Sequence, residues 1–371
     1  MTQPKVPYSY LHDQFKNRED LVDAVRQLSK TGQFTLGEPV EIFENRFAEM
    51  IGVKHAIGMN SGTDALVQIL RALCIGEGDE VITAPNSFIA TTGAIAVVGA
   101  IPVFVDVGDD YLIDVDKIST AITRKTKAIM PVHLTGNVAD MHEIMRIAMN
   151  YNLLVVEDSA QAVDADIDGR KAGNWGIASG FSFHPLKNLN GWGDGGMVTT
   201  NTGWLADRLR LLRNHGLSDR DNCDFFAYNT RLHSLQAVIL NKLLDEVPEI
   251  SDRRARNASY YDDMLKDVDE VVTPVKSERV RHVYHLYIVQ VERRGELMEF
   301  LDGHGIETKI HYPIPIHLQK AARYLRHKHG DFPVCEKQAE KILSLPVHQY
   351  LKKNQLSFVC KKIKEFYSKK K

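Results

Sequence analysis

The sequence lacks the features that mark membrane-spanning, secreted or nucleic-acid-binding proteins. No apolar window approaches the length needed to cross a bilayer, and the N-terminal Met-Thr-Gln-Pro-Lys-Val has no apolar core of the kind found in signal peptides. The 46 basic and 48 acidic residues leave a net charge of −2, so no overall field attracts nucleic acid. We therefore expect a cytoplasmic protein with neither a nucleic-acid nor a membrane partner.

Cysteine is scarce and scattered. There is no Cys-x-x-Cys pair and no histidine cluster at the spacing of a zinc site. Widely separated cysteines indicate reduced thiols in a cytoplasmic protein, and we expect no metal site. The four residues are Cys74, Cys223, Cys335 and Cys360.

The sequence does contain the pattern of a mostly parallel sheet with crossover helices. Hydrophobic residues make up 44% and charged residues 25%, the balance of an ordinary soluble enzyme. From about residue 50, short apolar runs alternate with amphipathic segments. We expect strands over 81–84, 103–105, 128–132 and 153–156, and helices over 89–99, 114–122 and 140–151, with Asp114 and Asp140 as N-caps of the last two.

The C-terminal part has a different order of elements. A helical region starts near residue 231, is broken at Pro248 and continues to about 268. A strand over 284–291, a helix over 294–304 and a short strand over 306–309 follow, as in a small α+β domain. Because 371 residues exceed the usual single core, we expect a large domain over 1–247, a small one over 248–371, and an N-terminal segment that packs on the small domain.

One lysine stands between a predicted strand end and a glycine-rich loop. Lys187 follows Ser182, and four of the six residues from Gly191 to Gly196 are glycine. Upstream, Asp158 follows the apolar run 153–156, which places it at the edge where parallel sheets bind ligands. A buried carboxylate needs a cation. The ring nitrogen of pyridoxal phosphate would supply one, and Lys187 would capture its aldehyde as a Schiff base.

Two further segments each have a binding and a structural interpretation. Ser61 to Asp64 precede an apolar helix, so their N–H groups and the Thr63 hydroxyl either bind an anion or form an ordinary capping turn. Phe88 follows a predicted strand and either stacks on a flat ring or belongs to the core.

From about Gly32 to Leu351, these segments together resemble the sugar aminotransferases of the DegT/DnrJ/EryC1 family. The resemblance implies the fold-type-I architecture of pyridoxal-phosphate enzymes, with helices on both faces of a mostly parallel sheet and a smaller C-terminal α+β domain. The matching elements come in the family's order: Gly32-Gln-Phe-Thr-Leu-Gly37, Ser61-Gly-Thr-Asp-Ala-Leu66, Glu157-Asp-Ser-Ala-Gln161, Ser182-Phe-His-Pro-Leu-Lys187, Gly193-Asp-Gly-Gly196, Arg213-Asn-His-Gly216, Asn229-Thr-Arg-Leu232 with Gln236, and His311-Tyr-Pro313.

The resemblance implies roles for the residues around the cofactor ring. It makes Lys187 the Schiff-base lysine and proton carrier, and Asp158 the partner of the pyridine nitrogen. Gln161 would lie near the phenolic oxygen, and Phe88 would stack on the ring.

It also implies how the phosphate is held. Gly62, Thr63 and Ser182 would bind it from the same subunit, and Asn229 would reach it from a neighbouring one. The chain would then be a homodimer with shared active sites.

The sugar pocket is less well defined by the resemblance. Many relatives have tyrosine before the glycine where this chain has Leu134-Thr135-Gly136, and they often have glycine at the position of Ala227. A histidine or aromatic residue in a turn is also often structural. The candidate sugar contacts are His184, Trp192, His311, Tyr312 and His317.

The function implied is transfer of an amino group from an amino acid, glutamate in this family, to a nucleotide-linked keto-sugar in amino-sugar biosynthesis. A sugar phosphate or a cyclitol ketone is an alternative acceptor, and a regulatory protein that keeps the fold without turnover is an alternative function. Related dehydratases have histidine where this chain has Lys187, which favours transamination. The sequence identifies neither the sugar nor the carbon aminated.

Overall fold

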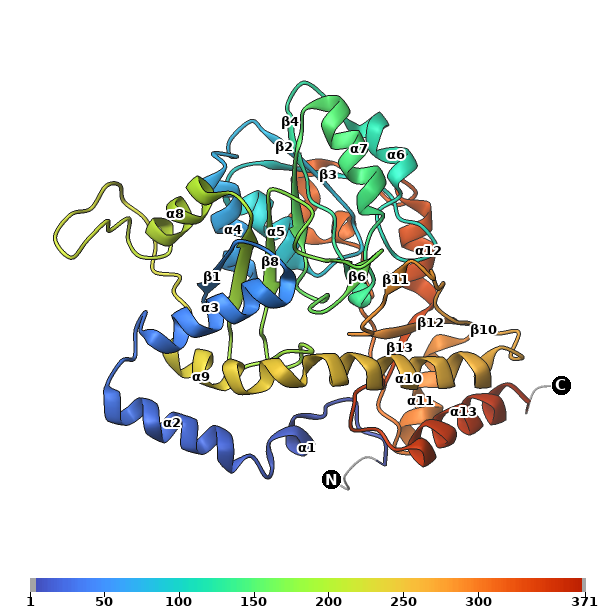
Figure 1. The fold of residues 1–371 in the computed structure, drawn as a ribbon. Coiled ribbons are helices and arrows are strands. Elements are labelled where there is room, and N and C mark those ends of the chain that lie inside the picture. Colours follow the sequence, from blue (N-terminus) through green and yellow to red (C-terminus); the bar gives the residue numbers. More distant parts are fainter. Residues whose placement is uncertain (1–4, 369–371) are drawn as a thin grey trace.

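A seven-stranded sheet forms the centre of the molecule (Figure 1). The structure is a computed structural model and describes residues 5–368. Across the sheet the strands follow the order β1, β9, β8, β5, β4, β2, β3. Among these described strands β9 alone runs antiparallel to its neighbours, which confirms the mostly parallel sheet. Their bounds are β1 His55–Met59, β2 Glu80–Thr83, β3 Ile101–Phe104, β4 Thr126–Ile129, β5 Leu154–Asp158, β8 Ala178–Ser182 and β9 Gly196–Thr200.

Helices cover both faces of this sheet, because successive side chains of each strand point to opposite sides. Val156 packs with α4, α5 and α8 on one face, while its neighbour Val155 packs with α6 and α7 on the other. The helices α3 and α9 extend the second face over β8 and β9. The bounds are α3 Glu38–Ile51, α4 Gly62–Ala72, α5 Ile89–Val97, α6 Val115–Ala121, α7 Met141–Tyr151, α8 Gly203–Leu212 and α9 Ser234–Leu243.

The expected strands and helices of this region are confirmed to within a few residues as β2 to β5 and α5 to α7. Both predicted N-caps are also confirmed, because the Asp114 side chain accepts a hydrogen bond from Asp116 N and that of Asp140 accepts one from Glu143 N.

A long helix links the central sheet to the C-terminal part. The helical region is interrupted by a 3-10 turn, Leu244–Glu246, and α10 then runs from Val247 to Leu265 with Pro248 in its first turn. Proline suits that place because the N–H groups of a helix's first turn have no partner within the helix, so the N–H that proline lacks is not needed. Beyond it lies an antiparallel sheet of β10 Val271–Val272, β12 Tyr287–Val291 and β13 Ile342–Leu345, with helices α11 Arg294–Gly303 and α13 Lys353–Ser368.

Two expectations for the C-terminal part are wrong in detail. The strand expected from residue 284 begins only at Tyr287, because Tyr284 has a positive φ of 45° and cannot continue an extended chain. The strand expected over 306–309 is absent from the described chain, where Ile306 and Lys309 form only isolated bridges to Val6 and Ser344.

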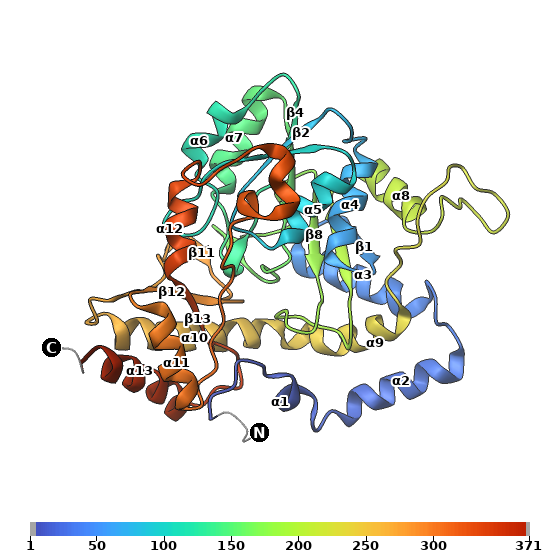
Figure 2. The same ribbon diagram turned by 180° about the vertical axis from the view of Figure 1, so that it is seen from behind.

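The N-terminal segment crosses beneath α10 and includes α1 Leu11–Phe15 and α2 Glu19–Thr31 (Figures 1 and 2). Val6 lies in the same hydrophobic core as β12, β13 and α13. The domain division at residues 247 and 248 stays a prediction, and its outer limits lie outside the described residues.

The remaining elements are short. A third sheet contains β6 Asp166–Ile167, β7 Arg170–Lys171 and β11 Val280–Arg281, and α12 spans Pro333–Lys341. Short 3-10 helices occupy Leu134–Gly136, Ile316–Leu318 and Lys320–Leu325. No helix within residues 5–368 is both long enough and apolar enough to span a bilayer.

Candidate active site

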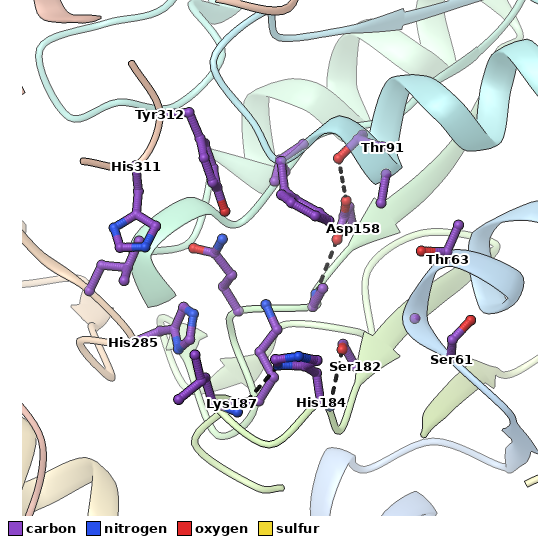
Figure 3. A pocket seen from close by; sticks show the side chains of 18 of the residues that line it. Ser61, Thr63, Thr91, Asp158, Ser182, His184, Lys187, His285, His311 and Tyr312 are labelled. Carbon is purple, nitrogen blue, oxygen red and sulfur yellow. Dashed lines mark hydrogen bonds between the residues drawn. The ribbon is translucent and has the colours of Figure 1, made fainter. Parts of the chain in front are cut away.

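A cavity of about 380 Å³ opens at the carboxyl ends of β5 and β8. Its walls come from the start of α4, the start of α5, the loop after β8, the N-terminal segment and the C-terminal part. In Figure 3, Ser61 and Thr63 lie on one side, His285, His311 and Tyr312 lie on the opposite side, and Asp158, Ser182 and Lys187 lie between them.

Asp158 is the last residue of β5 and is 5% exposed. Its Oδ2 accepts a hydrogen bond from Thr91 Oγ1 at 2.6 Å, and its Oδ1 accepts one from Ala160 N at 3.1 Å (Figure 3). Both partners are neutral, and no residue of the described chain forms an ion pair with Asp158 within 4.0 Å. The carboxylate therefore faces the cavity without a fixed cation, as expected for a group that awaits one from a ligand.

Lys187 enters the same cavity from the loop that follows β8. The residue is partly accessible through the cavity, yet enough protein surrounds its amine that desolvation lowers the pKa from 10.5 to about 8, against the opposing effect of Asp158. The loop is held by the N-terminal segment, since the Tyr10 hydroxyl donates to Lys187 O at 2.8 Å and Gln14 Nε2 donates to Asn190 Oδ1 at 2.7 Å. A lysine in this state is a nucleophile at neutral pH.

The start of α4 forms an anion-binding cradle beside Ser182. Ser61 caps the helix by accepting a hydrogen bond from Asp64 N at 3.1 Å, and Ser61, Gly62 and Thr63 line the cavity. Gly62 lets the helix approach the strand end, because a Cβ there would lie 2.7 Å from Ser182 Cβ. The cradle therefore offers backbone N–H groups with hydroxyls of Thr63 and Ser182.

Phe88 and Gln161 face the space between cradle and lysine. Phe88 is 53% exposed although it is apolar, and its ring centroid lies 5.6 Å from that of Tyr312. It is therefore not a core residue. Gln161 is buried, and its Oε1 accepts a hydrogen bond from Thr135 N at 2.7 Å. Thr135, at which this chain departs from many relatives, thus contacts the site through its backbone.

Three of the five candidate sugar contacts line the cavity, namely His184, His311 and Tyr312. Burial lowers the pKa of His311 to about 4 and also lowers that of His184, so both rings are neutral at pH 7. Trp192 and His317 do not line it. Trp192 packs edge-on against Phe15, and His317 Nε2 lies 3.0 Å from Glu336 Oε1, contacts that give both residues a structural role in the single chain.

Asn229 also lies away from the cavity of its own chain. It is exposed and pairs with Asn214 at the base of a loop that projects from the body of the molecule (Figures 1 and 2). The same loop carries Phe226, which is 101% exposed. An exposed aromatic side chain of this kind is common where a second protein binds.

Sequence reasoning missed several residues of the cavity wall. Thr91 follows Phe88 by one turn of α5, and that helical spacing was a signal that it faces the same space. The others had no local signal, because they come from segments that only the fold brings together. They are Tyr8, Tyr10, Arg254, His285 and His348. Within residues 5–368 no group of three or more His, Cys, Asp or Glu is placed to hold a metal ion.

The chain is similar to known proteins over nearly its whole length. It is 40% identical to the "Pleiotropic regulatory protein" of Geobacillus stearothermophilus, with 99% of each chain covered. It is 41% identical to the UDP-N-acetyl-3-dehydro-alpha-D-glucosamine 3-aminotransferase of Acidithiobacillus ferrooxidans, with 92% of each chain covered.

Solved structures agree with this similarity. The S. venezuelae DesV, in complex with a ketimine intermediate, superposes with a TM-score of 0.96 at 38% identity, covering 98% of this chain and 99% of its own. NtdA from Bacillus subtilis, with the bound cofactor PMP, superposes with a TM-score of 0.92 at 30% identity, covering 99% of this chain and 86% of its own. The family model described as the DegT/DnrJ/EryC1/StrS aminotransferase family matches residues 16–364. The chain therefore belongs to the DegT/DnrJ/EryC1/StrS aminotransferase family.

Proposed function

We propose that this protein is a pyridoxal-phosphate-dependent aminotransferase that moves an amino group from glutamate to a nucleotide-linked keto-sugar in amino-sugar biosynthesis. The observation that carries the proposal is Lys187, a lysine with a lowered pKa that shares one cavity with the unpaired carboxylate of Asp158. Relatives named as sugar-nucleotide aminotransferases support the acceptor.

The residues present fit pyridoxal phosphate. The cradle at α4 suits a phosphate, the half-exposed Phe88 suits the face of a ring, and the unpaired carboxylate of Asp158 suits a positively charged ring nitrogen. When bound, the group supplies an aldehyde that captures amines and a ring that withdraws electrons from the neighbouring bonds.

Lys187 has two tasks in this proposal. Its neutral amine would attach the cofactor to the chain, and its Nζ, when free, would take up and release the proton of the donor's α-carbon. Desolvation helps both tasks, because lowering the pKa from 10.5 to about 8 raises the neutral share of the amine at pH 7 from well below 1% to roughly a tenth.

Asp158 would balance the positive charge on the ring nitrogen, and Thr91 and Ala160 N hold the carboxylate in place through its two oxygens. Ser61, Gly62, Thr63 and Ser182 would bind the phosphate at the start of α4. Gln161, whose Oε1 accepts from Thr135 N, would lie near the phenolic oxygen.

We further propose a homodimer in which Asn229 completes the phosphate site of the neighbouring subunit. The exposure of Asn229 and of the loop around Phe226 supports this arrangement. Sedimentation of the cofactor-loaded protein should give a dimer. Mixing Lys187→Ala subunits with Asn229→Ala subunits should restore activity, because a mixed dimer contains one intact site. A stable, active monomer at micromolar concentration would contradict the proposal.

Three alternatives remain to be separated by experiment. Two of them concern the acceptor, which in these alternatives is a sugar phosphate or a cyclitol ketone. In the third, the protein is a regulatory member of the family, as the name of the Geobacillus stearothermophilus relative suggests for that protein. A cytoplasmic location is also part of the proposal, supported by four free cysteines.

The decisive experiment follows the two half-reactions separately. Loaded protein mixed with L-glutamate should lose its visible absorbance and release 2-oxoglutarate, and the aminated protein should then convert a nucleotide-linked keto-sugar to a product detected by mass spectrometry. Failure of the first half-reaction under all conditions would favour the regulatory alternative. A reaction with sugar phosphates or cyclitol ketones alone would show that the acceptor is not a nucleotide-linked sugar.

A further inference from the structure

Arg254 is a buried cation that the proposed mechanism does not use. It lies on α10, is 2% exposed, and has no carboxylate within ion-pair distance among residues 5–368. Its Nε donates to Gln349 Oε1 at 3.0 Å, and its Nη1 donates to Tyr284 O at 3.2 Å and His285 O at 3.3 Å. Its Nη2 is buried and makes no hydrogen bond of good geometry, although the Tyr10 hydroxyl lies near the guanidinium. A buried guanidinium with an unused donor and no counter-ion is costly, so it indicates a missing anion.

Arg254 lines the same cavity as Lys187, on the side away from the phosphate cradle. Its Nη1 contacts the backbone of His285, a residue that Figure 3 shows opposite Ser61 and Thr63. The Tyr10 ring lies below the guanidinium, 5.1 Å from its central carbon. The histidines nearby carry no charge at neutral pH, because burial lowers the pKa of His285 well below 6.5 and that of His348 to about 4. Arg254 is therefore the permanent positive charge of this side.

We propose that Arg254 binds a carboxylate of the amino donor, an inference that rests on the proposed function. A guanidinium matches the flat pair of oxygens of a carboxylate. The amino donor carries carboxylates within a few bonds of its reacting amine, whereas a nucleotide-linked sugar has its charges on a diphosphate away from the reacting carbon. Arg254 and Lys187 line one cavity of about 380 Å³, which favours the donor's carboxylate as the anion that Arg254 binds.

The first experiment compares variants in the two half-reactions. Arg254→Gln removes the charge and should lower kcat/KM for L-glutamate roughly tenfold to a hundredfold, as expected for a lost hydrogen bond to a charged group. Arg254→Lys should recover part of this loss. Reaction of the aminated protein with the keto-sugar should change less than about threefold. An equal loss in both half-reactions, or a loss only with the keto-sugar, would overturn the proposal, the latter in favour of a diphosphate.

A matched control comes from Arg294, which also donates to backbone carbonyls of the C-terminal part, at Ala339 and Ile342, but does not line the cavity. Arg294→Gln should leave both half-reactions unchanged. If it lowers the glutamate reaction as much as Arg254→Gln does, the effect is one of stability and the proposal is wrong.

The second experiment needs no variant. Calorimetry on the wild-type protein loaded with cofactor should detect binding of glutarate but not of its neutral diamide, and binding should persist at pH 9 because a guanidinium stays charged. Comparison of L-glutamine with the α-amide of glutamate as donors should then show which carboxylate is bound. Equal binding of glutarate and its diamide, or loss of glutarate binding between pH 6 and 8, would refute the proposal even if the Arg254 variants fail to fold. A wild-type protein that binds glutarate but does not react with glutamate would instead overturn the proposed function.

Discussion

The two sides of the cavity are built in different ways. The cradle, Asp158, Ser182 and Lys187 all belong to strand ends or to the loops that follow them, so the parallel sheet places them side by side. The opposite side combines Tyr10 from the N-terminal segment with Arg254 from α10 and other residues of the C-terminal part. The sheet thus fixes the groups that we propose for the cofactor, while distant segments meet to form the wall that we propose for the substrate.

The two sides also differ in charge. On the sheet side, Asp158 and a lysine of lowered pKa suit a ligand that has both a positive ring nitrogen and a reactive aldehyde. On the opposite side, neutral histidines surround one guanidinium. Changes on the sheet side should therefore abolish chemistry with any substrate, and changes on the opposite side should alter the choice or placement of substrates.

The largest effect is expected for Lys187→Ala. Turnover should fall below detection, because no amine remains to attach the cofactor or carry the proton. Borohydride should fix the cofactor on the peptide that contains Lys187 in the parent protein and on none in the variant.

Lys171→Ala is the matched control, since Lys171 is a partly buried lysine that pairs with Asp164 outside the cavity. It should keep both the label and the activity. A label on another lysine of the parent would show that the central residue has been misassigned.

Asp158→Asn should slow both half-reactions by roughly a hundredfold or more, in the range seen when a preorganised electrostatic group is removed. The amide still accepts from Thr91 but cannot balance a positive ring nitrogen. Stopped-flow measurement of the loss of visible absorbance on mixing with glutamate gives the rate. Asp106→Asn is the control, because Asp106 is a buried carboxylate that accepts from Val334 N and Cys335 N away from the cavity. Equal rates for the two variants would refute the role of Asp158.

The sheet side of the site could be predicted from the sequence for a physical reason. The apolar run before Asp158 defines a buried parallel strand, Ser182 ends another, and the carboxyl ends of such strands meet at one edge. Lys187 and the glycines after it follow Ser182 closely in the sequence. Local chain geometry therefore keeps them near the same edge. The observed positions of Gly62, Phe88 and Gln161 around the same cavity agree with that reasoning.

The opposite side could not be predicted, because its residues meet only through tertiary packing. Tyr10 and Lys187 are 177 residues apart in the sequence, and no periodic pattern connects them. The same limit explains why the sequence suggested His317 and Trp192 as sugar contacts, although their side chains contact other residues of the chain. It also explains why the strand was expected from residue 284, since no local pattern in the sequence indicates the positive φ of Tyr284.

The pH dependence of cofactor capture gives a smaller effect that tests the environment of Lys187. The neutral amine is the reactive form, and burial lowers its pKa from 10.5 to about 8. The rate at which the cofactor-free protein captures pyridoxal phosphate should therefore rise about tenfold per pH unit from pH 6 to 7 and level off above about pH 8. Stopped-flow absorbance from pH 6 to 10 measures it. A rate that keeps rising to pH 10 would mean that the amine is solvated.

The smallest effect is expected for Tyr10→Phe, which tests whether the N-terminal segment positions Lys187. The change removes the hydroxyl that donates to Lys187 O at 2.8 Å and Leu186 O at 3.2 Å, while the ring stays beside Arg254. Loss of these bonds should lower the free energy of unfolding by about 1 kcal/mol. The looser lysine loop should also lower kcat a few-fold for both half-reactions, because the amine would less often lie in the reactive position.

Tyr367→Phe is the control for that effect, because the Tyr367 hydroxyl donates to Glu292 O at 2.6 Å in the same way but outside the cavity. Urea denaturation should show a similar loss of stability in both variants, whereas single-turnover rates should fall only for Tyr10→Phe. Equal rates in the two variants would mean that the N-terminal segment stabilises the fold without positioning the lysine. A fall confined to the glutamate half-reaction would instead mean that Tyr10 acts with Arg254 in binding the donor. The lysine loop, which Tyr10 contacts, would then belong to both sides of the cavity.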